Sequence, residues 1–88
     1  PETNSLSQNY PNPFNPITCI EFDISLNTKV KLTLFDLTGK EIRELVNGLL
    51  NAGTYRFSLN GSNLASGVYI YKLETENFVD TKKMILLK

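Results

Sequence analysis

The stretch TCIEFDI, residues 18–24, decides the fold of this chain, because apolar and polar side chains alternate along it at every second position. Successive side chains of a β-strand point to opposite faces of the sheet, so this alternation indicates a strand with one buried and one solvated face. Ile20, Phe22 and Ile24 would then face the core. We therefore predict a half-buried strand here and a fold that is built from sheets.

The same period of two recurs in three later segments. After a turn at residues 25–28, the alternation resumes over residues 29–34, and residues 54–59 and 68–75 repeat it. Together the four segments predict a core that contains Ile20, Phe22, Val30, Leu32, Leu34, Tyr55, Phe57, Tyr69, Tyr71 and Leu73.

The connections between these segments are less regular. Residues 36–39 have the composition of a turn, in which Gly39 should adopt a positive φ. Residues 40–46 fit neither period well, so we expect a strand there, with a short helix as the alternative. The Asn-Gly and Ala-Gly pairs at residues 47–48 and 52–53 are expected to bracket a short connection.

The chain closes with a predicted hairpin. Residues 76–77 are a candidate tight turn, and the strand 78–87 would pair back antiparallel with Lys82 and Lys83 at its middle. Six or seven short strands, with turns every 8–12 residues or so and almost no helical period, are typical of an antiparallel sandwich. We predict an all-β, immunoglobulin-like antiparallel β-sandwich of about seven short strands, with an open barrel as the alternative.

The segment before the first strand has two parts. Residues 1–9 are almost entirely polar, which is typical of a linker or frayed terminus, so the domain is expected to span residues 10–88. The prolines between Tyr10 and Pro16 exclude a helix and favour an extended lead-in that is punctuated by turns, because each proline fixes φ and removes a backbone donor. Tyr10 and Phe14 are expected to anchor this lead-in to the domain.

The composition excludes several classes of function. The chain has no His, no Trp and one Cys, so a His general base, a disulfide and a structural zinc site have no residues to form them. We expect no catalysis, cofactor or metal. Nine Lys and Arg balance nine Asp and Glu, which gives no global field to attract nucleic acid or an anionic membrane. A start at Pro1 without Met suggests a piece of a longer protein.

Three minor patterns have both a structural and a functional interpretation. Asn60-Gly61-Ser62 matches a glycosylation acceptor but is also ordinary turn chemistry, which we favour. Cys19 lies on the polar side of its strand and could form an intermolecular disulfide if it is exposed. A set of aromatic side chains could form a platform for sugar, although their alternation favours core packing. These aromatic residues are Tyr55, Phe57, Tyr69 and Tyr71.

A series of short motifs runs from residue 6 to residue 88. They are residues 6–16 (LSQNYPNPFNP), residues 20–22 (IEF), Val30 with Leu32, residues 35–36 (FD) leading to residues 39–40 (GK), residues 52–53 (AG), residues 64–69 (LASGVY) and the closing Lys82, Lys83, Met84, Leu86 and Lys88. In their order and spacing they resemble the type A C-terminal sorting domain of proteins exported by the type IX secretion system of Bacteroidetes-like bacteria. The chain departs from that pattern at Ser25, where proline is frequent, and at Cys19, where a small or polar residue is usual.

The resemblance implies a non-catalytic domain at the C-terminus of a larger cargo protein that is secreted or displayed at the cell surface after passing through the periplasm. The implied partners are the outer-membrane secretion translocon, a sortase-like protease and the N-terminal cargo domain, with no nucleic acid or small-molecule substrate. A structural relative is the immunoglobulin-like domain of the flagellar hook-capping protein. The alternative is an accessory immunoglobulin-like spacer or carbohydrate-binding module of a secreted enzyme.

The terminal hairpin is the expected recognition site for the translocon. A terminal strand with a free end and a basic face would offer backbone groups for pairing and charges for register. Lysines on a terminal strand can instead protect an exposed edge, and a glycine before the hairpin can simply permit a turn or bulge. The residues expected to take part in recognition are Gly67, Tyr69, Lys82, Lys83, Met84, Leu86 and Lys88.

Overall fold

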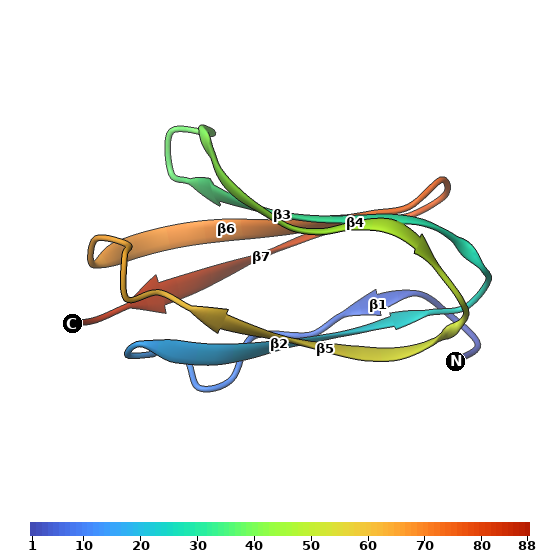
Figure 1. Ribbon diagram of the computed structural model, residues 1–88, viewed down its shortest axis with the longest axis horizontal. Coiled ribbons are helices and arrows are strands. Elements are labelled where there is room, and N and C mark those ends of the chain that lie inside the picture. Colours follow the sequence, from blue (N-terminus) through green and yellow to red (C-terminus); the bar gives the residue numbers. More distant parts are fainter.

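The computed structural model describes every residue from Pro1 to Lys88 and consists of strands and connecting loops. It offers no helix with the length and apolar character that a membrane crossing needs. Figure 1 shows the strands in two layers along the longest axis of the molecule. The strands are β1 (Ser5–Leu6), β2 (Ile17–Ile24), β3 (Thr28–Asp36), β4 (Glu41–Leu50), β5 (Gly53–Asn60), β6 (Gly67–Glu74) and β7 (Val79–Leu86).

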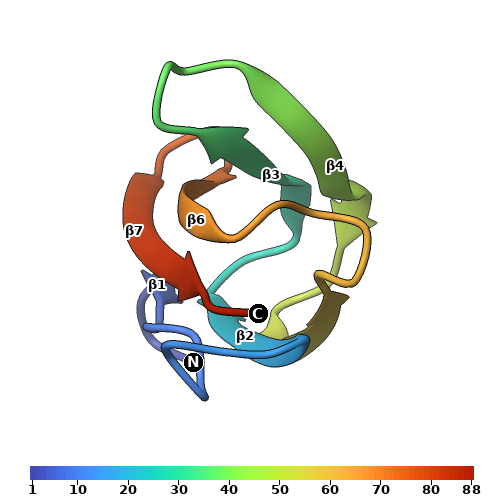
Figure 2. The same cartoon turned by 90° about the vertical axis from the view of Figure 1, so that its left-hand side faces the viewer.

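The two layers are antiparallel sheets of different size. One sheet has the order β1-β2-β5 and the other the order β4-β3-β6-β7. The view along the sandwich shows β1 and β7 on one side, with β4 on the other (Figure 2). The predicted all-β, immunoglobulin-like antiparallel sandwich of about seven short strands is therefore confirmed.

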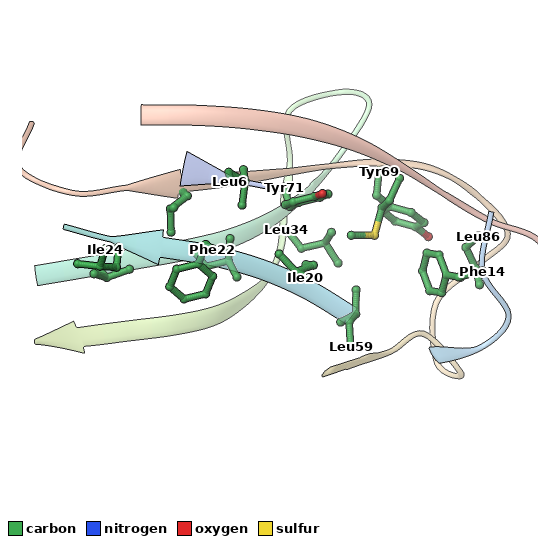
Figure 3. Packing of buried hydrophobic residues seen from close by; sticks show 14 residues of the cluster. Leu6, Phe14, Ile20, Phe22, Ile24, Leu34, Leu59, Tyr69, Tyr71 and Leu86 are labelled. Atoms are coloured by element: carbon green, nitrogen blue, oxygen red, sulfur yellow. The ribbon is translucent and has the colours of Figure 1, made fainter. Parts of the chain in front are cut away.

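The core lies between the inner faces of the two sheets, where the predicted alternation places its apolar side chains (Figure 3). Of the predicted core residues only Tyr55 and Phe57 are partly exposed. Both belong to β5, which has a paired neighbour on one side only. The ring of Tyr55 still stacks on Phe22, with the centroids 5.5 Å apart. The buried cluster comprises Leu6, Phe14, Ile20, Phe22, Ile24, Val30, Leu32, Leu34, Leu59, Tyr69, Tyr71, Leu73, Met84 and Leu86.

The irregular segment after residue 39 is a strand that is longer than predicted. β4 continues to Leu50, so the expected connection at residues 47–48 lies within the strand and the alternative of a short helix is wrong. The β3–β4 register shifts between Leu32 and Thr33 and again between Leu34 and Phe35. Each irregularity breaks the strict alternation of side chains between faces, which explains why the period was hard to recognise.

The turn at residues 36–39 has the predicted conformation at Gly39, with a φ of 87°. The carboxylate of Asp36 closes this turn by accepting hydrogen bonds from the Thr38 hydroxyl at 2.6 Å and from the main-chain N–H groups of Thr38 and Lys40. These bonds, the Thr38 hydroxyl first among them, favour the ionised carboxylate and lower the pKa of Asp36.

The N-terminal segment is more ordered than the expected linker over residues 1–9. Ser5–Leu6 forms strand β1, which pairs with β2 opposite Phe22 and Asp23. Leu6 and Asn9 are buried, at 5% and 2% exposure. An isolated Leu in a polar run gives no period, so local pattern could not predict this strand; its stability comes from burial of Leu6 in the core.

The lead-in, residues 10–16, is punctuated by bends at residues 11–13 and 15–16, as predicted, but has only one aromatic anchor. Phe14 is 2% exposed and belongs to the core, whereas Tyr10 is 81% exposed, so the expected second anchor at Tyr10 is wrong. The main chain of Tyr10 nevertheless exchanges two hydrogen bonds with Cys19 on β2, at 3.0 and 2.9 Å. The lead-in is therefore held by its backbone at one point and by the ring of Phe14 at another.

Candidate functional site

The terminal strand β7 lies at the edge of the four-stranded sheet, where it pairs with β6 from Val79 opposite Glu74 to Leu86 opposite Gly67. The predicted hairpin is therefore present. Its connection runs from residue 75 to residue 78, and the Thr75 N–H donates a hydrogen bond to the Phe78 carbonyl at 2.8 Å.

Three of the expected recognition residues are part of the core. Met84 and Leu86 have no exposed surface, and Tyr69 is 8% exposed. The Tyr69 hydroxyl donates a hydrogen bond to the carbonyl of Ala65 at 2.6 Å, which holds the loop before β6. A partner in contact with the folded domain meets none of these side chains directly, so their part in recognition could only be to position β7.

The two lysines at the middle of β7 do not form the expected single basic face. Side chains alternate along the strand, so Lys82 lies on the same side as the core residue Met84, while Lys83 lies on the outer side and is exposed. The ammonium of Lys82 is 3.9 Å from a carboxylate oxygen of Asp80, which shares its face. Lys83 forms no ion pair, which leaves its charge available to a partner.

The end of the chain is attached to the loop between β5 and β6. The main-chain N–H of Lys88 donates a hydrogen bond to the Ser66 hydroxyl at 3.0 Å, and its ammonium donates one to the carbonyl of Ser62 at 2.7 Å. Gly67, the first residue of β6, has a φ of 155° and lies opposite Leu86. The expectation of a free terminal end is therefore wrong.

The outer edge of β7 is covered over its C-terminal half by the N-terminal segment. The side chain of Gln8 donates a hydrogen bond to the Lys83 carbonyl at 2.6 Å, and the Ile85 N–H donates one to the side-chain oxygen of Asn12 at 2.9 Å. Phe14 then acts as a short parallel neighbour: its N–H bonds the Ile85 carbonyl at 2.9 Å, and its carbonyl accepts from the Leu87 N–H at 3.1 Å.

This cover was missed by the sequence reasoning, although a signal for it was present. A lead-in that contains three prolines has few backbone donors, so it cannot form a regular strand, and at Asn12 the side-chain oxygen accepts the Ile85 N–H in place of a main-chain carbonyl. Pairing of isolated main-chain and side-chain groups is how such a segment can protect a sheet edge.

Tyr71 ties the same N-terminal segment to the inner face of β6. Its hydroxyl accepts a hydrogen bond from the Asn9 N–H at 2.8 Å and donates one to the Ser7 carbonyl at 2.7 Å. Burial raises the pKa of Tyr71 to about 12; the Asp80 carboxylate acts in the same direction and the Asn9 N–H in the opposite one. The hydroxyl is therefore neutral and acts as both donor and acceptor.

The minor patterns resolve into structural roles. The aromatic set packs into or against the core, as its alternation predicted. The side-chain oxygen of Asn60 accepts hydrogen bonds from the N–H and hydroxyl of Ser62, which is the predicted turn chemistry. Cys19 is half-buried and lines a surface hollow of about 340 Å³ together with Tyr10 and Arg56. No three His, Cys, Asp or Glu side chains are grouped closely enough to hold a metal ion.

Comparison with known proteins agrees with the motifs in the chain. No curated protein matches it. The family model of the secretion system C-terminal sorting domain matches residues 8–87, which include the lead-in and the strands from β2 to β7. The chain therefore belongs to the family of secretion system C-terminal sorting domains, and its function is that of a sorting signal for type IX secretion.

Proposed function

We propose that the outer-membrane translocon recognises this domain at its terminal hairpin, residues 67–88, and that the domain contributes no catalysis of its own. The observation that carries the proposal is the attachment of the end of β7 to the rest of the fold. Gln8, Asn12 and Phe14 hold its outer edge, and Ser62 and Ser66 hold Lys88. A receptor that handles many cargoes must recognise a shared surface, and these contacts give the hairpin a fixed shape only when the domain is folded.

Within this hairpin the side chains have two different parts. The buried side chains of Tyr69, Met84 and Leu86 position β7, while Lys83 and Lys88 present positive charge at the surface. Charged side chains at the rim of an interface favour encounter and fix register more than they add affinity. Lys82 contributes less in this scheme because Asp80 already neutralises it.

The positions of the two chain ends support recognition of the domain while a cargo is attached. Pro1 and Lys88 lie at opposite ends of the long axis, which extends 37 Å (Figure 1). A cargo domain joined to Pro1 would therefore leave the end of β7 uncovered. In this proposal the cargo passes through the periplasm, the translocon binds the hairpin and exports the cargo, and a sortase-like protease removes the domain, so that the cargo is secreted or displayed at the cell surface.

Export of a fusion protein tests the proposal. The 88-residue domain is placed behind a periplasm-competent reporter in a bacterium that has this secretion system. Three proteins are compared: the unmodified fusion, Lys82→Ala/Lys83→Ala, and a fusion without Lys88. Lys29→Ala/Lys40→Ala is the matched control, because these two lysines are also exposed and lie outside the hairpin. Circular dichroism and thermal unfolding of each purified domain verify that the fold is retained.

We expect the unmodified and control fusions to reach the medium or cell surface and the two hairpin variants to remain in the periplasm. Exposed charges contribute little to stability, so the variants should unfold within a few degrees of the unmodified domain. Retention of the unmodified fusion in the periplasm would contradict its role as a sorting signal. Equal export of all four proteins would leave that role intact and show that the lysines are not what the translocon recognises.

A further inference from the structure

The four sheet edges of the sandwich differ in how they are protected. β1 has two residues, β7 is covered by residues 8–14 over its C-terminal half, and β4 has two register shifts and three charged side chains. Short length, covering loops, bulges and charges are the usual means by which proteins prevent pairing at sheet edges. β5 is neither short, nor covered by a loop, nor bulged. It is eight residues long, and its register with β2 is continuous from Ile17 opposite Asn60 to Ile24 opposite Gly53.

The ladder pattern identifies the unpaired groups of β5. Cys19 exchanges both of its main-chain hydrogen bonds with Tyr10. The N–H and carbonyl groups of odd-numbered residues of β2 therefore point toward the N-terminal segment, and those of even-numbered residues point toward β5. The residues of β5 whose N–H and carbonyl groups form hydrogen bonds with β2 are consequently the odd-numbered ones. The N–H and carbonyl groups of Thr54, Arg56 and Ser58 point outward from the edge of the sheet, and no other main-chain segment pairs with them. At the end of this edge the Asn60 carbonyl accepts a hydrogen bond from the Arg43 side chain at 3.4 Å.

The side of the sandwich next to this edge also exposes apolar surface. β4 and β5 are the edges of the two sheets on the side opposite β1, β7 and the lead-in (Figure 2). On that opposite side Leu6 and Phe14 cover the core and are themselves buried, at 5% and 2% exposure. Between β4 and β5 the apolar side chains remain only partly buried, which contrasts with the closed side; they include Leu45, Val46, Tyr55 and Phe57.

We propose that an extended segment of the translocon pairs with β5 as an added strand of the three-stranded sheet. This inference rests on the sorting role and names a second contact that is separate from the terminal hairpin. The unpaired groups of Thr54, Arg56 and Ser58 supply the backbone hydrogen bonds. Apolar side chains on the inner face of the added strand cover Tyr55 and Phe57, because residues on one face of neighbouring strands pack against each other.

Charge favours a segment of another protein over a second copy of this chain. Arg56 lies at the centre of the three open residues, and its guanidinium pairs with the Glu21 carboxylate of β2 at 2.9 Å. An antiparallel pair of β5 strands from two copies, centred there, would place two Arg56 side chains directly opposite each other, with each Glu21 already engaged by the Arg56 of its own copy. Like charges in that position are destabilising. The occupant therefore has a neutral or acidic side chain opposite Arg56 and apolar residues at the alternate positions.

Replacing single residues on the open edge by proline tests the proposal. Ser58→Pro removes an N–H that bonds nothing within the domain, and its ring occupies the path of an added strand. Ser58→Ala changes the side chain and keeps the N–H. Asn47→Pro is the matched control. The Lys83 carbonyl lies on the outer edge of β7, and the alternation of hydrogen-bonded residues followed from there through β6 and β3 places the Asn47 N–H on the open edge of β4. Each is introduced into the exported fusion protein, and the isolated domains are compared by circular dichroism and gel filtration.

We expect Ser58→Pro to reduce export roughly tenfold or more, because an obstructed edge loses more than one backbone hydrogen bond. Ser58→Ala and Asn47→Pro should be exported like the unmodified fusion. Equal export of folded Ser58→Pro would overturn the β5 contact while leaving the sorting role in place, and retention of the unmodified fusion would overturn both. A dimer of the isolated domain that Ser58→Pro dissociates would overturn the choice of occupant in favour of a second copy.

Hydrogen exchange provides a measurement that does not depend on folding of the proline variant. The unmodified domain is mixed with translocon that has been purified in detergent, and exchange at each amide is compared with that of the domain alone. The proposal expects slower exchange at Thr54, Arg56 and Ser58 in the complex, and unchanged exchange at Asn47. Binding without slower exchange on β5 would overturn it.

Discussion

Replacing Tyr71 by Phe removes one oxygen atom from the centre of the contact between the N-terminal segment and β6. That hydroxyl accepts from the Asn9 N–H at 2.8 Å and donates to the Ser7 carbonyl at 2.7 Å, so the variant leaves two main-chain groups without their partner. Tyr71 is fully buried and Asn9 is 2% exposed, so water cannot replace the hydroxyl at the Asn9 N–H. Ser7 is only half-buried, so its carbonyl can be hydrated at smaller cost.

The magnitude follows from these two environments. A buried donor that loses its partner costs about 1–3 kcal/mol, and a hydrated carbonyl adds little, so we expect Tyr71→Phe to lower the free energy of unfolding by about 2 kcal/mol. For a domain of this size that corresponds to a fall in the unfolding midpoint of roughly 8–16 °C. Urea unfolding followed by circular dichroism gives the free energy, and the slope against denaturant should be unchanged because the fold is the same.

Tyr69→Phe is the matched control. Its hydroxyl donates a single hydrogen bond to the carbonyl of Ala65, an exposed residue, so the variant should lose less than about 1 kcal/mol. A Tyr71→Phe domain as stable as the unmodified one, or a larger loss in Tyr69→Phe, would show that the tyrosine bridge does not hold the N-terminal segment.

Two further predictions concern the same segment. Phe14→Ala should lower the free energy of unfolding in urea by about 3–5 kcal/mol, because the ring is 2% exposed in the core. Tyr10→Ala should change it by less than about 0.5 kcal/mol, because Tyr10 is 81% exposed. Equal effects of the two variants would contradict the single anchor. The pKa of Tyr71 is raised from 10.0 to about 12 in the folded state, so the stability that its neutral hydroxyl contributes is fully present below pH 10 and is lost as the pH rises through 12. Unfolding measured across this interval should show a steeper decline than in Tyr71→Phe, and parallel curves for the two proteins would refute the assignment.

Strand positions were largely predictable because the signal for them is local. The alternation over residues 18–24 depends only on the geometry of an extended chain and on which side chains avoid water, and it holds in β2 without any knowledge of the partner strand. The alternation failed to define the strand where pairing with the partner strand changes the backbone geometry. β4 pairs with β3 through two irregularities, and no feature of residues 41–50 taken alone shows where the partner strand shifts.

The family, too, was determined by the sequence, because its motifs are an ordered set of residues that needs no coordinates. The properties of the terminal strand were not. That Lys82 faces Asp80 while Lys83 faces solvent follows from strand alternation, but whether the edge of β7 is free depends on a segment far away in the chain. Asn12 and Ile85, which close it, are separated by 73 positions. A contact of this kind forms only when the two sheets pack and bring the N-terminal segment next to β7. Only the tertiary structure could therefore decide that β7 is covered and β5 is open.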